Sequence, residues 1–414
     1  MISKASSHAE DKKGVVKLVS DHEACTGCGV CALNCPVGCI TMKESGEGFF
    51  YPDVDKEKCT GCGFCEEKCH LNSSGRFEEG KAYAVISRNE DELQRSSSGG
   101  VFSVLARKIL DGGGIVVGCE LQDGTYPRHV IIREPADLCR LRGSKYVESD
   151  LAPILRELAE EAKNGRKILF SGTGCQIGAV RSLLGANDNI IYAEILCHGV
   201  PSRSLFQRHN EFIEQKYGDK LTDIRFRCKE NASWNTSYRF AYTFRSGKTI
   251  VIPAYRDAYY MNFIKSSIMR PSCYRCAYAG NRRIGDITLG DYWGVENYHP
   301  ELDASKGVSA VLVNTPAGER LFHECGEELT VIPTKAQYVQ ERVHAMKAPI
   351  PKPPERDGIY ARIEEIGYAA WNRQYNRSKL RCAEGVKVVV KRILPDKLRI
   401  KAARIYHGKS GRVD

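Results

Sequence analysis

The fold of the N-terminal part of this chain is decided by Cys25-Thr-Gly-Cys28-Gly-Val-Cys31-Ala-Leu-Asn-Cys35-Pro36 and by Cys59-Thr-Gly-Cys62-Gly-Phe-Cys65-Glu-Glu-Lys-Cys69. Both runs follow the spacing C-x2-C-x2-C-x3-C, so the region is an internal repeat of two similar halves. Three closely spaced thiolates can wrap one face of a metal cluster. Glycines beside the cysteines allow the backbone to fold tightly around it.

This spacing is typical of bacterial 4Fe-4S ferredoxins, in which the fourth cysteine of each run ligates the other cluster. The first ferredoxin set is therefore predicted to be Cys25, Cys28, Cys31 and Cys69. The second ferredoxin set is predicted to be Cys59, Cys62, Cys65 and Cys35. Structural zinc is the alternative, but it uses paired C-x2-C knuckles separated by a longer gap, so the pattern favours iron–sulfur clusters.

Two residues near these runs stand out. His70 follows the second run where proline is usual, which changes the local turn but removes no ligand. Cys39 is a ninth cysteine in the region and is interpreted as a small buried hydrophobic residue.

Length and cysteine content limit the class of protein. The chain has 414 residues, which favours two or three domains, and no apolar run approaches the roughly 18 residues of a membrane span. No signal-peptide core is found at the N-terminus. Eighteen cysteines in such a chain indicate metal ligands in a cytoplasmic protein rather than disulfides.

The formal net charge of +10 lies entirely in the last part of the chain, since residues 372–414 hold thirteen Lys or Arg and three acidic residues. Basic residues there alternate with apolar ones. This pattern fits an anionic membrane surface, which would make the protein peripheral at the inner membrane face. An acidic partner protein or a terminal helix packed on the body fits equally well. Nucleic acid is not expected, because no surface combining aromatic and basic residues accompanies the tail.

Four regions are predicted: a polar tail at 1–18, a two-cluster ferredoxin domain at 19–76, an oxidoreductase domain at 80–345 and a basic C-terminal segment at 346–414. The ferredoxin domain should be α+β. The next domain alternates strand-like and helix-like segments, which predicts an α/β fold with a mixed sheet. The expected strands are 82–87, 115–118, 167–170, 190–196 and a hairpin of 239–245 with 249–253. The expected helices are 101–110, 150–163, 175–184 and 202–217.

Four further cysteines lie at informative places. Cys175 and Cys197 each follow a predicted strand, and Cys273 and Cys276 form a C-x2-C knuckle. Ligands of open α/β sheets collect at the carboxyl ends of strands. On spacing alone, these residues are either one further cluster site or two core cysteines and a zinc knuckle.

The chain resembles the coenzyme F-420 hydrogenase/dehydrogenase beta-subunit family. The resemblance spans about residues 95–295 and rests on five motifs in the family's order. They are Ser96-Ser-Ser-Gly-Gly-Val-Phe102, Gly143-Ser-Lys-Tyr146, Gly172-Thr-Gly-Cys-Gln176, Cys197-His-Gly-Val-Pro-Ser202, and Cys273-x2-Cys276 with Gly285-Asp-Ile-Thr-Leu-Gly-Asp-Tyr-Trp-Gly294.

The resemblance implies FAD and a third 4Fe-4S cluster in the α/β domain. The cluster ligands it implies are Cys175, Cys197, Cys273 and Cys276, here called the third set. Gly174 departs from the family, because many relatives have proline there. Five cysteines match no motif and are interpreted as structural: Cys119, Cys139, Cys228, Cys325 and Cys382.

The candidate flavin-binding residues are Ser98, Gly99, Gly100, Gly143, Ser144, Lys145 and Tyr146. Serine hydroxyls and bare glycine amides before a helix can cradle phosphate oxygens. Lys145 adds a cation, and Tyr146 adds a ring that can stack. An ordinary helix cap and a solvated lysine are the alternatives. Asp286, Asp291 and His198 are equally well explained as structural residues.

The predicted function is an iron–sulfur flavoprotein oxidoreductase. An external electron carrier or redox partner protein exchanges single electrons with the clusters, and FAD exchanges a hydride with coenzyme F-420 or another organic acceptor. The alternative is a non-catalytic electron-transfer subunit of a larger complex. Clusters with a purely structural role are disfavoured by two complete ferredoxin runs. The catalytic residues, the substrate and the direction of transfer do not follow from the sequence.

Overall fold

The computed structural model describes residues 21–72, 75–229, 234 and 239–377. The polar tail and most of the basic C-terminal segment lie outside these residues. The prediction that this segment binds a membrane surface or an acidic protein therefore concerns residues that the structure does not describe. In the described part, no helix is both long and apolar enough to cross a bilayer.

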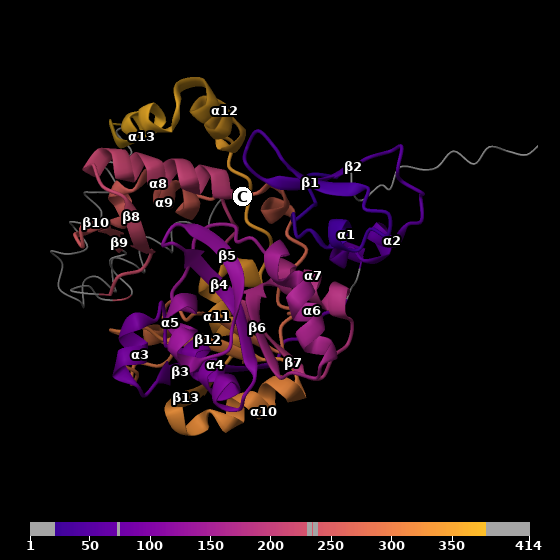
Figure 1. Ribbon diagram of the computed structural model, residues 1–414. Coiled ribbons are helices and arrows are strands. Elements are labelled where there is room, and N and C mark those ends of the chain that lie inside the picture. The colour runs from indigo at the N-terminus through magenta and orange to yellow at the C-terminus, as the bar shows by residue number, and fades with distance from the viewer. Residues whose placement is uncertain (1–20, 73–74, 230–233, 235–238, 378–414) are drawn as a thin grey trace, which may run out of the picture.

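The N-terminal module is a small α+β unit (Figure 1, indigo). An antiparallel hairpin of β1 (Ile40–Glu44) and β2 (Phe50–Val54) is flanked by the short helices α1 (Val30–Leu33) and α2 (Phe64–Glu67). Both helices begin after a glycine in the left-handed conformation, Gly29 at φ 78° and Gly63 at φ 72°. A Cβ atom is unfavourable at such φ, which explains the glycine within each cysteine run.

The second domain is built on an eight-stranded mixed sheet in the order β13-β3-β12-β11-β7-β6-β4-β5. The four central strands β11, β7, β6 and β4 run parallel, and the outer strands pair antiparallel. The strands are β3 (Lys81–Ser87), β4 (Ile115–Gln122), β5 (Tyr126–Ile132), β6 (Ile168–Thr173), β7 (Ile190–Ile195), β11 (Ile287–Asp291), β12 (Ser309–Val313) and β13 (Leu329–Thr334). The predicted α/β domain with a mixed sheet is thus confirmed.

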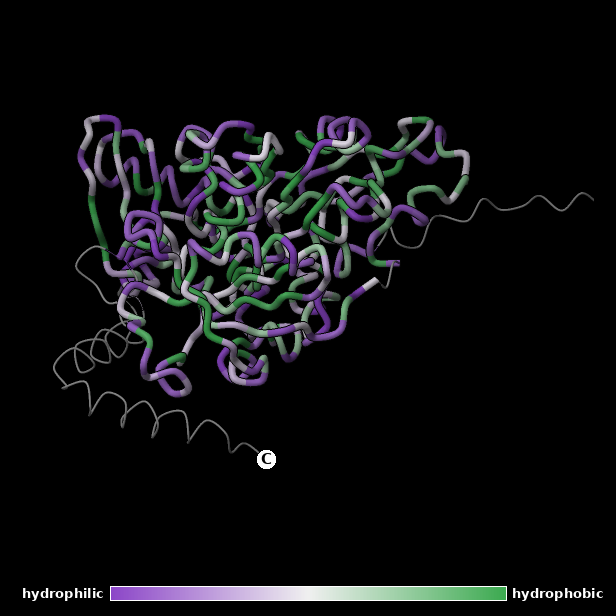
Figure 2. Tube along the Cα trace, turned by 90° about the horizontal axis from the view of Figure 1, so that it is seen from below, coloured by the Kyte–Doolittle hydropathy of each residue, from purple (hydrophilic) through white to green (hydrophobic). Residues whose placement is uncertain are grey.

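Helices cover both faces of this sheet, and the apolar segments lie between the layers while polar segments lie outside (Figure 2). One face is covered by α4 (Val101–Asp111), α5 (Leu138–Leu141) and α10 (Pro316–Glu324), with α3 (Glu90–Arg95) beside them. The other is covered by α6 (Leu155–Lys163), α7 (Gly174–Leu184) and α11 (Ala336–Arg342).

A smaller sheet in the order β10-β9-β8 forms a separate aromatic core with four helices. Its strands are β8 (Leu221–Arg225), β9 (Arg239–Phe244) and β10 (Thr249–Pro253). The helices are α8 (Arg203–Tyr217), α9 (Ala258–Ile264), α12 (Arg356–Ile366) and α13 (Tyr368–Arg377).

Most predicted elements are present within one or two residues, including the hairpin of β9 and β10. The helix expected over 150–163 is shorter: a 3-10 turn at Ala152–Ile154, which contains a proline, precedes α6. Seven strands were not predicted: β1, β2, β5, β8, β11, β12 and β13.

The ferredoxin module packs against the second domain at two places. Val30 of α1 is buried in the core that contains α7, and Phe49 and Tyr51 are buried in the aromatic core. Arg270 of the second domain also joins the two parts. Its guanidinium donates hydrogen bonds to the carbonyl oxygens of Cys25 at 2.9 Å and Phe50 at 2.6 Å. The cysteines of the module are therefore held close to the α/β domain.

Candidate functional site

The first ferredoxin set is brought together from both halves of the module. The pKa of Cys31 is raised to about 12, mainly by burial and in smaller part by the neighbouring thiols of Cys25 and Cys69. Burial likewise raises the pKa of Cys28, with Cys31, Cys25 and Cys69 again nearby. The structure therefore places Cys69 with the three cysteines of the first run, as the crossed ligand pattern requires.

The second ferredoxin set lies nearer the surface, with Cys62 exposed. Cys39 is buried, and its Sγ atom lies 3.4 Å from Sγ of Cys35. The pKa of Cys39 is raised mainly by burial and also by contacts with Cys35 and Cys59. Cys35 of the first run is thus beside Cys59 of the second, the other half of the crossed pattern.

The third set is assembled from three loops at one edge of the sheet. Cys175 lies in the first turn of α7 after β6, Cys197 follows β7, and the other two lie in or directly after the 3-10 turn Pro271–Arg275. Burial raises the pKa of Cys175 to about 11 and that of Cys197 to about 12. The pKa of Cys273 and Cys276 is also raised by burial.

These four thiols lie near one another. As a result, other members of the set contribute to the raised pKa of Cys175, Cys197 and Cys273. Buried thiolates that repel each other are costly unless a cationic centre neutralises them, so the donor set fits an iron–sulfur cluster. Among the described residues, no three His, Cys, Asp or Glu side chains are arranged to hold a single metal ion. The assignment to clusters therefore depends on spacing and position.

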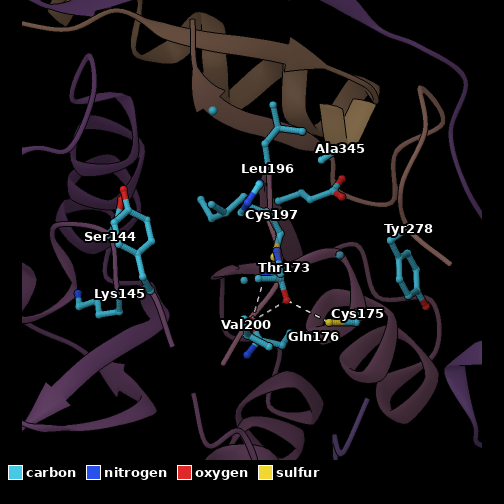
Figure 3. A pocket seen from close by; sticks show the side chains of 18 of the residues that line it. Ser144, Lys145, Thr173, Cys175, Gln176, Leu196, Cys197, Val200, Tyr278 and Ala345 are labelled. Atoms are coloured by element: carbon cyan, nitrogen blue, oxygen red, sulfur yellow. Dashed lines mark hydrogen bonds between the residues drawn. The ribbon is translucent and has the colours of Figure 1, made fainter. Parts of the chain in front are cut away.

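Hydrogen bonds to sulfur surround the third set, as they do in iron–sulfur proteins, where they tune the potential. The backbone N–H groups of Gly199 and Tyr278 donate to Sγ of Cys197 at 3.3 Å and Cys276 at 3.4 Å. The Thr173 hydroxyl lies 3.2 Å from Sγ of Cys175 (Figure 3).

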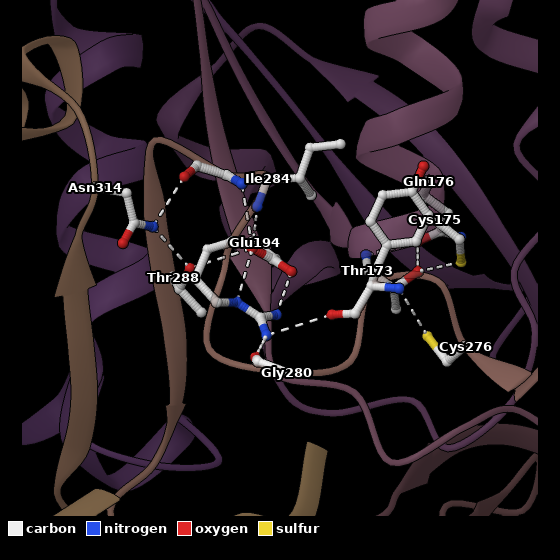
Figure 4. Close-up of polar contacts among 12 residues, drawn as sticks. Thr173, Cys175, Gln176, Glu194, Cys276, Gly280, Ile284, Thr288 and Asn314 are labelled. Carbon is white, nitrogen blue, oxygen red and sulfur yellow. Dashed lines mark hydrogen bonds and ion pairs between the residues drawn. The ribbon is translucent and has the colours of Figure 1, made fainter. Parts of the chain in front are cut away.

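A buried ion pair braces the loop that carries Cys276. Glu194, at the end of β7, pairs with Arg283, and both side chains are almost fully buried. Glu194 also accepts hydrogen bonds from the N–H groups of Ile284 and Gly285, each at 3.1 Å (Figure 4). Arg283 in turn donates to the carbonyl oxygen of Gly280 at 2.8 Å.

We expect Glu194→Gln to lower the free energy of unfolding by about 3–5 kcal/mol, because it leaves the buried Arg283 charge without its partner. The third cluster should be lost more readily than the ferredoxin clusters, since the braced loop carries Cys276. Thermal unfolding and iron retention during anaerobic dialysis measure both effects. Glu301→Gln, at an exposed carboxylate, is the control. Equal stability and equal iron retention in the two variants would contradict the brace.

One cavity of about 890 Å3 extends along the third set. All four of its cysteines line the cavity, together with Cys28 of the first ferredoxin set. Its wall also includes the serine loop 96–98 and the loop 143–146. Figure 3 shows Ser144 and Lys145 of the second loop. The two loops are joined by a hydrogen bond of 2.7 Å from the Ser144 N–H to the Ser97 hydroxyl.

Three of the candidate flavin residues have structural contacts that the sequence did not indicate. The hydroxyl of Ser98 donates to the Val308 carbonyl oxygen at 2.8 Å. Gly99 is not part of the cavity wall, and a Cβ atom there would lie 2.3 Å from the Val85 carbonyl oxygen. The ammonium group of Lys145 donates to three carbonyl oxygens at residues 140–142, at 2.8 to 3.3 Å.

All of the candidates except Gly99 line the cavity, including the other four, Gly100, Gly143, Ser144 and Tyr146. Gly143 has φ 80° and open space where a side chain would lie. The Tyr146 ring stacks on Phe263 with 4.6 Å between ring centroids. These residues shape one end of the cavity, and the third set forms part of the rest.

Several cavity residues were not singled out from the sequence. His129 contacts the Ser149 hydroxyl at 2.9 Å, and Gln176 donates to the same hydroxyl at 2.8 Å. Trp293 also lines the cavity. Gln176 and Trp293 stand in motifs that carry the family resemblance, whereas His129 stands in none. A place in a cavity was not predicted for any of the three, because strands and loops distant along the chain bring them together.

His198, Asp286 and Asp291, for which a structural role was an equally good explanation, differ in whether they line the cavity. His198 lines the cavity and contacts the Ser266 hydroxyl at 3.1 Å, and burial lowers its pKa. Asp286 is buried outside the cavity wall and accepts a hydrogen bond from the Tyr192 N–H at 2.8 Å. Asp291 lines the cavity and pairs with Arg227.

The fold and the cysteine sets define an iron–sulfur protein that joins a dicluster module to an α/β domain. The family models for the N-terminal and C-terminal parts of the coenzyme F-420 hydrogenase/dehydrogenase beta subunit match residues 82–156 and 165–336. The model for a 4Fe-4S dicluster domain matches residues 24–73. The chain belongs to the coenzyme F-420 hydrogenase/dehydrogenase beta-subunit family, with a dicluster ferredoxin domain at its N-terminus.

Three relatives illustrate the similarity. A subunit of the F(420)H(2) dehydrogenase of Methanosarcina mazei is 23% identical over 344 residues, covering 76% of this chain and 86% of the relative. A subunit of the NADH-quinone oxidoreductase of Blochmanniella floridana is 46% identical over 46 residues, covering 10% of this chain and 25% of the relative. A solved chain of the F-420-reducing nickel–iron hydrogenase complex from Methanosarcina barkeri superimposes with a TM-score of 0.44 at 18% identity, covering 72% of this chain and 91% of that chain.

Proposed function

We propose that this protein is an oxidoreductase with three 4Fe-4S clusters and FAD, which exchanges electrons with a redox partner and a hydride with an organic molecule. The observation that carries the proposal is the shared cavity. Its wall contains the Ser97 and Ser144 loops at one place, the third set at another, and Cys28 of the first ferredoxin set. An electron carrier and a hydride carrier could thus sit within one space.

The order of the cysteine sets supports a relay. Cys62 of the second ferredoxin set is exposed, the first ferredoxin set faces the cavity through Cys28, and the third set lines it. FAD bound in the cavity would supply the exchange between single electrons and a hydride. The residues proposed to hold it are Gly100, Gly143, Ser144 and Tyr146, while Ser98, Gly99 and Lys145 shape the two loops.

The organic molecule is proposed to be coenzyme F-420 or a similar hydride acceptor. Support comes from family membership and from the relative in Methanosarcina mazei, whose name includes F(420)H(2). The relatives named as parts of larger enzymes also suggest that the chain works with partner proteins.

An acceptor panel tests the proposal. The anaerobically loaded protein is reduced chemically, and its flavin absorbance is followed after addition of F-420, NAD or NADP. Flavin reoxidation that matches the appearance of a reduced acceptor supports a catalytic subunit. A protein that contains clusters but neither binds flavin nor reduces any acceptor is instead the electron-transfer subunit of the alternative.

The basic segment leads to a separate prediction. We expect the full chain to bind anionic vesicles at low salt, since each Lys or Arg near an anionic leaflet contributes about 1 kcal/mol. A chain ending at Arg377 lacks residues 378–414, which hold most of the excess positive charge, and should stay in the supernatant with its cofactors. Co-sedimentation at two salt concentrations measures this. Absence of the full chain from the vesicle pellet would favour a protein partner or a packed helix.

A further inference from the structure

A buried tyrosine–histidine contact joins the ferredoxin module to the third set. His70 directly follows Cys69, and its side chain is buried at the interface with α7. Its Nδ1 atom lies 2.7 Å from the Tyr278 hydroxyl, and its Nε2 atom lies 2.9 Å from the hydroxyl of Thr26. A neutral tautomer with Tyr278 donating to Nδ1 and Nε2–H donating to Thr26 satisfies both contacts. The Tyr278 hydroxyl also lies 3.3 Å from the carbonyl oxygen of His70.

The other end of Tyr278 belongs to the third set. Its N–H group donates to Sγ of Cys276 at 3.4 Å, and its carbonyl oxygen accepts a hydrogen bond from Arg283 of the buried ion pair. Tyr278 is therefore held at its backbone by the cluster loop and at its hydroxyl by His70.

Two glycines of α7 make room for this tyrosine. A Cβ atom at Gly178 would lie 2.1 Å from the Tyr278 hydroxyl oxygen, and one at Gly174 would lie 2.7 Å from the Tyr278 Cβ atom. Such distances are far below van der Waals contact, so larger residues at either position would displace the ring. The packing is specific to a tyrosine placed between the two sets.

We propose that Tyr278 and His70 form the junction that positions the first ferredoxin set against the third set and carries electrons between them. This rests on the proposed function, in which both sets hold 4Fe-4S clusters. One electron leaves the reduced cluster and one arrives at the oxidised cluster, and no bond or proton is exchanged. Electron tunnelling decays less steeply through bonds and hydrogen bonds than through gaps, so the continuous contact from Cys69 to Cys276 favours transfer.

A second bridge between the same sets runs through Arg270. Its side chain donates to the Cys25 carbonyl oxygen, and its own carbonyl oxygen accepts from the Cys273 N–H, each at 2.9 Å. The Arg270 side chain also contacts the thiol of Cys25. The Tyr278 bridge differs because it reaches the third set through an N–H group bonded to the sulfur of Cys276. The experiment must separate the two.

The test uses Tyr278→Phe in the full, anaerobically loaded chain. After mixing with one equivalent of reduced methyl viologen, rapid-freeze EPR follows the electron from the ferredoxin clusters to the third cluster. We expect the transfer to slow about tenfold or more, as for other residues that support metal ligands, while iron content stays unchanged. The spin coupling between the two reduced clusters should also weaken.

The matched control is Tyr368→Phe. Tyr368 is equally buried and is distant in the sequence from every cysteine of the three sets, and its hydroxyl lies 2.9 Å from Nδ1 of His209. This variant removes the same kind of hydrogen bond and should transfer electrons at the wild-type rate. Equal rates in wild type and Tyr278→Phe would overturn the proposal and favour the Arg270 bridge.

Two substitutions of His70 keep the proposal testable if Tyr278→Phe loses iron. Asparagine can place its amide oxygen near the Nδ1 position and accept the hydrogen bond from Tyr278, whereas glutamine reaches the Nε2 position and keeps only the Thr26 contact. We expect His70→Asn to retain the transfer rate and His70→Gln to lower it. The opposite order would refute the junction. Absence of a third cluster in the wild-type protein would instead refute the proposed function.

Discussion

A Cys276→Ser protein is expected to lose about four of twelve irons, since each cubane holds four. It should keep the EPR signals of both ferredoxin clusters, because their ligands lie in a separate module. Electron transfer from the reduced ferredoxin clusters to any hydride acceptor should be abolished, since the third set lines the cavity proposed to hold the flavin. Iron and sulfide assays with EPR of the reduced protein measure these effects.

Cys228→Ser is the control for this substitution. Cys228 is buried, whereas the cysteines of the third set are partly buried, and it belongs to none of the three sets. It should leave iron content and EPR spectra unchanged. Full iron content in the Cys276→Ser protein would contradict the third cluster, and zinc in place of iron would contradict all three.

Ser144→Glu is expected to abolish FAD binding while the clusters remain. Ser144 lines the cavity at the loop joined to Ser97, so the new carboxylate would face the proposed site of an anionic cofactor. Two like charges about 4 Å apart repel by about 4 kcal/mol at an effective dielectric constant near 20, which corresponds to roughly thousand-fold weaker binding. Absorbance of the flavin after gel filtration gives the occupancy.

Ser246→Glu is the matched control, because Ser246 lies in the exposed turn between β9 and β10. It should retain FAD at the wild-type level. Normal flavin occupancy in Ser144→Glu would move the flavin to another part of the cavity. Gly99→Val is not a useful probe, because its Cβ atom would collide with the Val85 carbonyl and disturb the sheet.

The sequence was most informative where ligand spacing is local. The two cysteine runs predict the module because their ligands are a few residues apart, and the crossed placement of Cys35 and Cys69 follows from the same pattern. The third set was predicted from the rule that ligands gather at the carboxyl ends of parallel strands, together with the family resemblance. Cys175 and Cys197 follow the neighbouring parallel strands β6 and β7.

Contacts between distant residues could not be predicted. Glu194 and Arg283 are 89 residues apart, and neither lies in a motif that indicates an ion pair. Local contacts were missed as well: Lys145 lines the cavity as a candidate for a pyrophosphate or a flavin carbonyl, and its ammonium group also donates to carbonyl oxygens at the end of α5. The sequence states which side chain stands at each position, but it does not state which hydrogen-bond acceptor will lie nearest to that side chain in the fold.

The two departures from familiar patterns are explained by one residue. His70 stands where proline is usual after a cysteine run, and it contacts the Tyr278 hydroxyl. Gly174 stands where many relatives have proline, and it makes room for the Tyr278 side chain. Each departure looked incidental in the sequence, because the residue they share lies more than a hundred positions from either.

The most direct test of the proposed function is a cofactor and redox analysis of the full chain purified without oxygen. We predict about twelve irons, an equal amount of sulfide and one FAD per chain. Reduced methyl viologen should bleach the flavin in the wild-type protein, and bleaching should slow in the Cys276→Ser protein. A chain with about eight irons, as two cubanes hold, and no flavin would contradict the central claim and leave a two-cluster electron carrier.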